Sequence, residues 1–309
     1  MKNKVFNFLY SAQDERKAIF YMIAGGFCFA TMGALTFKLG KDVDWVFIAF
    51  WRMLFSFVLV FFLASKSGKT TILFSRKLLW LRSITGTIAM LATFYSFTHL
   101  PVSDVSAITE TRPVWVALLA VAILGERLRR ALLPITVLSI IGVLLIEKPH
   151  FDNRNFAVFV TLAASVLGAV VMICLRKLRD LDPRTIVTHF SLTATVGSVI
   201  FMYFFRDIGL YADYFKGYII LTLIGIGIFG TIGQLTMTKA FALGRASIVS
   251  STGYAKVGFS AIYDLILFSA VFELYTIVGM LMILGASTWL LNSSDGLQIT
   301  RARLNNQDS

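Results

Sequence analysis

The chain is a succession of long apolar runs separated by short polar connections. Each run holds about 17 to 23 residues, and a helix of this length crosses the ~30 Å hydrocarbon layer of a membrane. Very short connections, such as Leu100–Val102, require neighbouring helices to be antiparallel and adjacent. The pattern predicts an all-α polytopic membrane protein with ten transmembrane helices, near residues 18–37, 45–65, 79–98, 103–124, 132–147, 156–175, 185–205, 217–238, 246–268 and 272–292.

The composition favours a membrane protein over a soluble one. Of the 309 residues, 57% are hydrophobic and 15% are charged, whereas soluble domains contain about 25% charged residues. In a soluble protein, the net charge of +12 would suggest a nucleic-acid partner. Here the basic residues lie in short loops between apolar runs, so we expect a lipid bilayer and no nucleic acid.

Lys and Arg are unequally distributed between alternate loops. With a cytoplasmic N-terminus, twenty of the 29 lie in cytoplasmic segments, Arg82 among them, and six lie on the opposite side. Because positively charged loops stay in the cytoplasm, we expect a bacterial inner-membrane protein with both termini in the cytoplasm. The sequence outside the spans then forms a cytoplasmic N-terminal segment, 1–17, and a cytoplasmic tail, 293–309.

The sequence contains a weak internal repeat. Phe97–Ser103 aligns with Phe241–Ser247 at an offset of 144 residues, and Asp44 resembles Asp182 in the turn before the second span of each half. The repeat divides the spans into five and five, over residues 18–149 and 150–292. An odd number of spans per half places the second half upside down in the membrane. Inverted repeats of this kind let one site at mid-depth face either side in turn.

Charged residues lie in the middle of two apolar spans. Glu110, Arg112 and Pro113 are near the centre of the fourth span, and Lys256 follows Arg112 by 144 residues, in the ninth. A charge at this depth is costly unless it faces protein or water, so it is a candidate functional group by default. The two cations either bind an anionic substrate group or pair with nearby carboxylates and only stabilise the bundle. Glu110 would pair with a substrate cation or carry a coupling proton.

Pro113 predicts an interruption of the fourth helix. Proline lacks an N–H and crowds the carbonyl four residues earlier, which here belongs to Thr109. Interrupted helices at mid-depth often present backbone groups to a substrate, although many such kinks serve packing alone.

Other side chains within the spans are weaker candidates. Arg52 lies about two turns into its span, and we expect it to face inward as a third cation for the substrate. His189 and Asp264 are candidates for proton coupling, although a lone His is often structural and Asp264 is near the end of its span. Some aromatic side chains are within reach of a central cavity and would stack on a planar substrate, while most aromatics in such a chain face lipid or core. These candidates are Trp51, Tyr95, Trp115 and Tyr254.

No pattern typical of an enzyme is present. The sequence has no Gly-rich phosphate loop, no His/Cys spacing for a metal and no acyl-transfer triad in a soluble domain. We therefore expect no catalytic residues, no metal and no cofactor. An intramembrane enzyme and a structural or receptor-like membrane protein remain as alternatives to a transporter.

Several short motifs resemble those of one transporter family. They are Leu81-Arg82 with Gly86, Phe94–Phe97, Leu100–Ser103, Arg112–Val114, Leu124–Arg127 and Gly142–Ile146. Together with ten spans in two halves, they resemble the drug/metabolite transporter superfamily, specifically its EamA-type permeases. The second half departs from the family pattern, because Ser269-Ala270 stands where Gly-Glu is expected.

This resemblance implies a secondary transporter that moves a small polar metabolite across the inner membrane by alternating access. The stretch Tyr95–Pro149 is similar to permeases that take up S-adenosylmethionine. We therefore expect uptake of S-adenosylmethionine as the function. Exchange against an internal metabolite is one way in which this uptake would occur. An amino-acid or organic-anion exporter of the same superfamily is the alternative. A homodimer is compatible with either.

Overall fold

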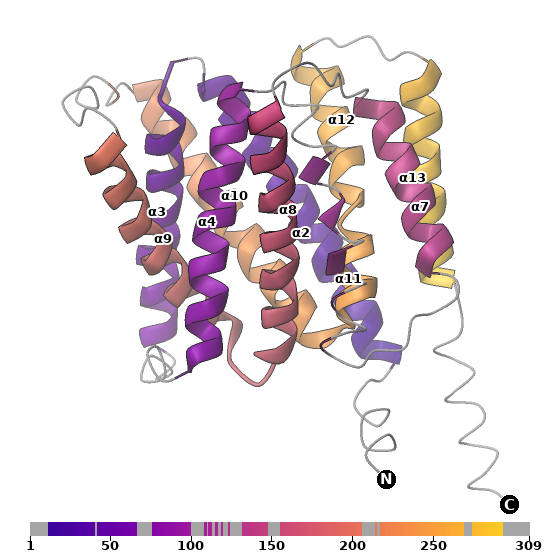
Figure 1. Ribbon diagram of the computed structural model, residues 1–309, viewed down its shortest axis with the longest axis horizontal. Coiled ribbons are helices and arrows are strands. Elements are labelled where there is room, and N and C mark those ends of the chain that lie inside the picture. Colours follow the sequence, from indigo (N-terminus) through magenta and orange to yellow (C-terminus); the bar gives the residue numbers. More distant parts are fainter. Residues whose placement is uncertain are drawn as a thin grey trace, which may run out of the picture.

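The structure is a computed structural model, and it describes residues 12–40, 42–66, 76–99, 108–109, 111–112, 115–116, 119, 123, 132–147, 155–205, 214, 217–268 and 274–292. All regular elements in these ranges are helices, which stand side by side as one bundle (Figure 1). In chain order they are α2 (Ala12–Leu39), α3 (Trp45–Ser65), α4 (Lys77–His99), α7 (Leu132–Glu147), α8 (Asn155–Lys177), α9 (Pro183–Phe205), α10 (Gly217–Leu243), α11 (Ala246–Thr252), α12 (Ala255–Phe268) and α13 (Leu274–Asn292). The predicted all-α fold is confirmed.

The helices correspond to the predicted membrane spans. α11 and α12 together form the ninth span, and the fourth span is described at a few positions, which are helical at 108–109, 112, 115–116, 119 and 123. Six helical segments are by themselves long and apolar enough to cross a membrane, namely Gln13–Leu39, Trp45–Ser65, Lys77–Ser96, Val158–Lys177, Pro183–Phe205 and Gly217–Leu243. The chain is therefore a multi-pass membrane protein.

The second helix of each half begins in the same way. The Asp44 side chain accepts the backbone N–H of Val46 (2.8 Å) at the start of α3, and Asp182 accepts that of Arg184 (2.9 Å) at the start of α9. Such a carboxylate satisfies an N–H group that the first turn of a helix leaves without a partner. The resemblance of the two acidic turns in the sequence therefore reflects equivalent helix starts.

The two halves are interlocked. α2 packs mainly on α10 and α8 packs mainly on α4, so the first helix of each half contacts the third helix of the other. α3 packs on α9 and α7 packs on α13, which joins the two second helices and the two fifth helices. α2 begins at the lower edge of Figure 1, where α8 ends, so the two first helices run in opposite directions. Inverted repeats related by a pseudo-twofold axis in the membrane plane have this arrangement.

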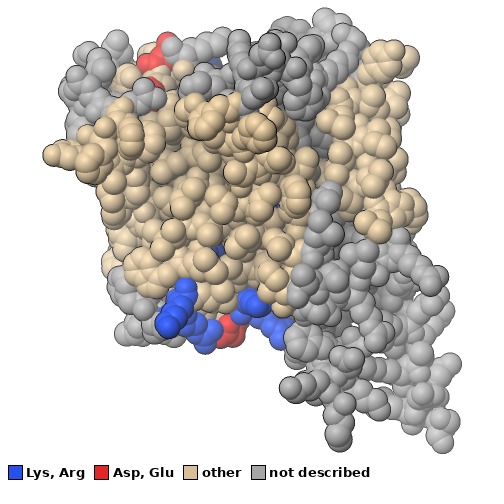
Figure 2. Space-filling model, in the orientation of Figure 1, with Lys and Arg blue, Asp and Glu red and all other residues tan. Residues whose placement is uncertain are grey.

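The outer surface of the bundle is apolar between its two ends. Figure 2 shows a broad belt of uncharged residues between basic side chains at the lower edge and acidic side chains at the upper edge. At the ends of α4 and α8, Arg76 and Lys77 are exposed, and Arg76 pairs with Asp180 at 2.5 Å. Large apolar side chains such as Leu221 (73% exposed) and Phe204 (70% exposed) point outward. A surface of this kind is suited to lipid.

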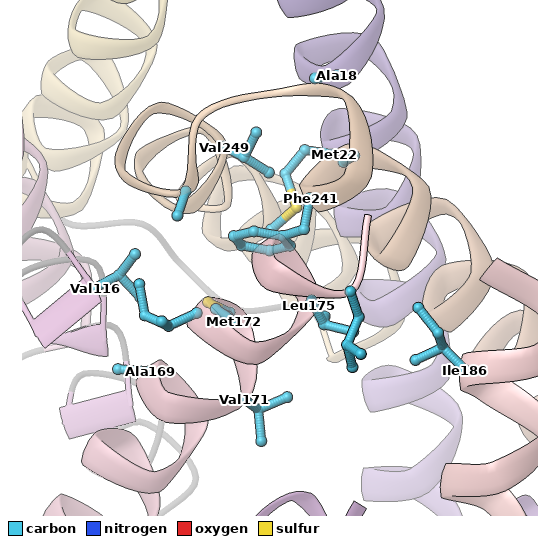
Figure 3. Close-up of a cluster of buried hydrophobic side chains, with 14 of the residues drawn as sticks. Ala18, Met22, Val116, Ala169, Val171, Met172, Leu175, Ile186, Phe241 and Val249 are labelled. Atoms are coloured by element: carbon cyan, nitrogen blue, oxygen red, sulfur yellow. The ribbon is translucent and has the colours of Figure 1, made fainter. Parts of the chain in front are cut away.

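One buried cluster joins the two halves near the end of α10. At its centre is Phe241, which is fully buried and lies beside Met22 of α2 and Val249 of α11 (Figure 3). Val116 of the fourth span belongs to the same cluster and lies beside Met172 of α8 (Figure 3). The fourth span of the first half is thus held against the first helix of the second half.

Two helices extend beyond their predicted limits. α2 begins at Ala12 rather than at residue 18, because Glu15 in its first turn pairs with Nε of Arg245 at 2.6 Å, which anchors this turn to the chain that follows α10. Acidic side chains in a first turn also interact favourably with the helix dipole. α10 continues to Leu243 rather than ending at 238, since carbonyl groups near its end accept hydrogen bonds from Arg176 of α8.

The close approach of α3 and α10 at Gly227 makes this glycine necessary for the fold. A Cβ at Gly227 would lie 2.5 Å from Cγ and 3.0 Å from Cβ of Phe55, so the base of this side chain, and not only its far end, would have to shift. We expect Gly227→Ala to destabilise the protein by about 1–3 kcal/mol, measured as a lower melting temperature in detergent. The control is Gly33→Ala in α2, which meets no atom within 4 Å and should be neutral or stabilising. Equal effects of the two variants would contradict the packing described.

Candidate substrate-binding site

Arg112 and Lys256 occupy equivalent places in the two halves. The guanidinium of Arg112 lies on Gly168 of α8, where an added Cβ would be 2.5 Å from its Nε. Lys256, in the first turn of α12, has its backbone against Gly26 of α2, where an added Cβ would be 3.4 Å from the Lys256 backbone N. Each of the two residues therefore lies against a glycine in the first helix of the opposite half, Arg112 with its guanidinium and Lys256 with its backbone. Both residues are partly exposed.

The ninth span is interrupted immediately before Lys256. The sequence predicts a span over 246–268, and within it α11 ends at Thr252 and α12 begins at Ala255. The intervening Gly253 donates its N–H to the Ser250 carbonyl (3.0 Å), and the Lys256 N–H is bonded to the Gly253 carbonyl (3.0 Å). Apolar composition alone predicts the span but does not register a local turn within it.

Gly253 fits this turn because a side chain would have no room there. An added Cβ would be 2.9 Å from Cε of Met22 in α2 and 3.0 Å from the Ser250 carbonyl oxygen. The turn at Gly253 therefore lies against the first helix of the other half.

The fourth span also turns immediately before its cation. The N–H of Thr111 bonds to the Ile108 carbonyl at 3.2 Å, and Arg112 follows directly. Ser165 of α8 lies 3.4 Å from the Thr109 carbonyl oxygen and 3.1 Å from Oγ1 of Thr111. The carbonyl that the sequence singled out thus accepts a hydrogen bond from the opposite half. Glu110 and Pro113 lie outside the described residues.

Arg52 is buried between three helices. It belongs to α3, is 7% exposed, and its guanidinium carbon lies 5.9 Å from the centre of the Phe29 ring in α2. A Cβ on Gly230 of α10 would be 2.8 Å from Nε of Arg52, so the missing side chain of this glycine provides the space for the guanidinium. The inward orientation predicted for Arg52 agrees with this burial.

Arg82 is a buried cation that the sequence analysis missed. It was assigned to a cytoplasmic loop, yet it lies inside α4, is 1% exposed, and its guanidinium carbon is 3.9 Å from the centre of the Phe190 ring of α9. The assignment was wrong because Arg82 follows Arg76 and Lys77 closely and continues their basic run. The motif that joins Arg82 to Gly86 was the available signal, since a Cβ on Gly86 would lie 3.0 Å from the same Phe190 ring.

His189 lies at the flank of the bundle between α4 and α9. Its Nδ1 is 2.8 Å from Oγ of Ser83, and Trp80 meets its ring edge-on at 4.5 Å. A small groove of about 220 Å³ is lined by Trp80, His189, Leu192, Thr193 and Val196. Val196 is half exposed on the lipid-facing side. The role of His189 in proton coupling stays a prediction, and the side chain of Asp264 lies outside the described residues.

The four aromatic candidates lie in different surroundings. Trp51 and Tyr95 are partly buried beside the cluster around Phe47 and Phe190, while Trp115 packs beside the cluster around Phe241. Trp115 also donates its Nε1–H to Thr111 Oγ1 at 3.3 Å, next to Arg112. Tyr254 is fully buried at the junction of α11 and α12. Trp115 thus lies beside the turn at Thr111, and Tyr254 lies in the break between α11 and α12. Trp51 and Tyr95 lie beside the other buried cluster, which contains Phe47 and Phe190.

No metal centre is visible in the part of the chain that the structure describes, where no three His, Cys, Asp or Glu side chains converge. The candidate site residues that the structure describes are instead cations and hydroxyl groups, several of which lie against glycines. Such residues bind a ligand through charge and hydrogen bonds.

The EamA-like transporter family matches this chain twice, over residues 16–147 and 155–292. The pseudopaline exporter CntI of Pseudomonas aeruginosa is 26% identical over 291 residues, covering 91% of this chain and 98% of that protein. Solute carrier family 35 member G1 of Homo sapiens is 27% identical over 285 residues, covering 87% and 77%. An S-adenosylmethionine uptake transporter of Rickettsia felis is 24% identical over 250 residues, covering 80% and 82%.

The fold is also found in a solved structure. A chain described as the crystal structure of a protein superposes with a TM-score of 0.78 at 15% sequence identity, covering 89% of this chain and 96% of that chain. At this identity the likeness shows the fold alone.

The hydroxyl contact between Thr111 and Ser165 should stabilise the interrupted fourth span. We expect a double-mutant cycle of Thr111→Val and Ser165→Ala to give a coupling free energy of about 0.5–2 kcal/mol, measured by unfolding in detergent. The control pairs Ser165→Ala with Thr85→Val, whose hydroxyl bonds only to carbonyls of its own helix. Additive effects of Thr111→Val and Ser165→Ala would show that the contact carries no energy.

Proposed function

Because the chain belongs to the EamA-like transporter family, we propose that it is a secondary transporter that moves a small polar metabolite by alternating access. The chain is a multi-pass membrane protein with a small-molecule substrate, as its family and relatives indicate. The observation that carries the mechanism is the pair Arg112 and Lys256. Lys256 follows the interruption of the ninth span, Arg112 follows the turn at Thr111, and each residue lies on a glycine of the opposite half.

The pair Arg112 and Lys256 would bind an anionic group of the substrate. Lys256 lies in the first turn of α12, and the positive end of a helix dipole favours an anion. Interrupted helices at the repeat interface supply such groups in other transporters. When the halves rock against each other, a substrate held by both cations would pass from one side of the membrane to the other. Glu110 would then bind a substrate cation or a coupling proton.

S-adenosylmethionine is our first choice of substrate. It carries a carboxylate for the cations, an amine and a sulfonium for Glu110, and an adenine for an aromatic side chain such as Trp115. The relative from Rickettsia felis supports this choice by its name. Export of an amino acid or organic anion is the second candidate, favoured by the excess of buried cations and by the exporter of Pseudomonas aeruginosa. A non-transport role has no comparable support.

We further propose an inner-membrane protein with both termini on the cytoplasmic side. The support is the basic edge seen in Figure 2, where α2 begins and α8 ends, because cytoplasmic loops are rich in Lys and Arg. The proposed domain limits, 18–149 and 150–292, lie within a few residues of the two family matches. A homodimer stays a proposal.

The substrate is tested by uptake of labelled S-adenosylmethionine into proteoliposomes, with and without S-adenosylhomocysteine inside. Saturable uptake that the internal metabolite stimulates would support both the substrate and exchange. Competition by amino acids or organic anions would indicate the second candidate. Absence of uptake by folded protein would reject S-adenosylmethionine and leave the transporter family unaffected.

Removing the charge of Arg112 or of Lys256 should strongly reduce transport while keeping the fold. We expect Arg112→Gln and Lys256→Gln to lower kcat/KM for uptake by about tenfold or more, because each hydrogen bond to a charged group is worth about 1.5–3 kcal/mol. Arg179→Gln, at an exposed basic position, is the control and should transport normally. Normal uptake by both central variants would exclude these cations from the site.

Gly168 and Gly26 offer a finer test of the same site. An Ala at position 168 would displace the guanidinium of Arg112 (2.5 Å to Nε), while an Ala at position 26 would only touch the backbone of Lys256 at 3.4 Å. Because the guanidinium is the flexible end of its side chain, we expect Gly168→Ala to keep its melting temperature but lose most uptake. Gly26→Ala should retain most uptake. The reverse order of effects would contradict the proposed geometry.

A further inference from the structure

We propose that Arg52, Arg82 and Gln234 form an anion-binding site in the centre of the bundle, in addition to the pair Arg112 and Lys256. The three side chains come from α3, α4 and α10 and are 7%, 1% and 6% exposed. The anionic group would be a carboxylate of the substrate or a free inorganic anion. Binding of a free inorganic anion goes beyond the proposed function, whereas binding of the substrate carboxylate rests on it.

The three side chains have buried hydrogen-bond donors in common. Nε of Arg52, Nε and Nη1 of Arg82, and Nε2 of Gln234 are inaccessible to solvent and have no hydrogen-bond partner within the described part of the chain. Neither guanidinium forms an ion pair with an Asp or Glu there; aromatic rings are their described neighbours. A cation–π contact is worth much less than the desolvation of a buried charge. Two such charges therefore require an acceptor of opposite charge.

Arg176 shows that a buried guanidinium in this fold can donate to backbone carbonyls. It is also 7% exposed, but its Nη1 donates to the carbonyl oxygens of Phe241 (3.4 Å) and Ala242 (3.3 Å) at the end of α10. The carbonyl groups near a helix C-terminus carry partial negative charge and lack helical partners. Arg52 and Arg82 lie beside helix interiors, where such carbonyls are not available.

The packing brings the donors toward one region. Arg52 lies on Gly230, and Gln234 is one turn further along α10, so both flank the same stretch of that helix. Arg82 lies on Phe190, which belongs to the same buried cluster as Met53, the residue after Arg52. Arg52 and Arg82 thus adjoin the same buried cluster, and an anion there would be attracted by both guanidinium groups.

The chemistry of the donor set defines the ligand class. Guanidinium groups bind carboxylates and other oxyanions through charge-assisted hydrogen bonds, and the Gln234 amide adds a neutral donor. Chloride is bound by the same groups. A ligand that lacks an anionic group would face two like charges and is not expected to bind here.

The experiment measures the melting temperature of the purified full-length protein in detergent at constant ionic strength. A bulky sulfonate is replaced stepwise by chloride or by formate, and separately S-adenosylmethionine is added in the sulfonate buffer. We expect saturable stabilisation of the wild type. Arg82→Gln and Gln234→Leu should weaken the apparent affinity for the anion by about tenfold or more. Arg176→Gln, the control, should melt lower yet keep the anion dependence.

The outcomes separate the two sources of the anion. Stabilisation by chloride or formate without substrate would support a free-anion site, whatever the result of the uptake assay. Stabilisation by S-adenosylmethionine alone, lost in Gln234→Leu, would support its carboxylate. If Arg82→Gln does not fold, Gln234→Leu carries the test, because it removes only a neutral group. A wild type indifferent to all three ligands, or variants that respond as the wild type does, would overturn the proposal.

Discussion

A positive charge inside an apolar bundle must be matched by a partner, and the arrangement of this protein depends on that constraint. Arg52 and Arg82 are almost fully buried in helices whose outer faces suit lipid, and Arg112 and Lys256 adjoin interruptions in theirs. Each of these positions is costly in a membrane. The fold accommodates the long side chains by placing glycines opposite them, as at Gly230 and Gly168. For Arg52 and Arg82, we propose that the partner of opposite charge is the bound anion.

The inverted repeat explains why an equivalent arrangement occurs in both halves. The first helix of each half packs on the third helix of the other, and a glycine of that first helix, Gly26 or Gly168, lies beside Lys256 or Arg112 of the other half. A movement of one half therefore displaces the surroundings of the cation that belongs to the other. This coupling between packing and charge is the physical basis on which inverted repeats support alternating access.

Much of the fold could be predicted from the sequence because the length of an apolar run fixes the length of a span. The equivalence of Arg112 and Lys256 followed from a constant offset. Local geometry was harder to predict from the sequence: the turn at Gly253 lies against Met22 of α2, more than two hundred residues earlier. Arg82 resembled a loop residue because its burial depends on Phe190, which only the folded chain brings beside it.

The most direct test of the account asks whether one central position is reached from both sides of the membrane. Cys28 and Cys174 are free and buried, so their replacement by Ala should leave a background for a single cysteine in the variant Gly258→Cys, where an added Cβ meets no atom within 4 Å and Lys256 is kept. In proteoliposomes, a membrane-impermeant thiol reagent would be applied outside or enclosed inside. We predict labelling from either side, with substrate changing the ratio of the two rates. Labelling from one side only, in protein that transports, would contradict a site shared between the inverted halves.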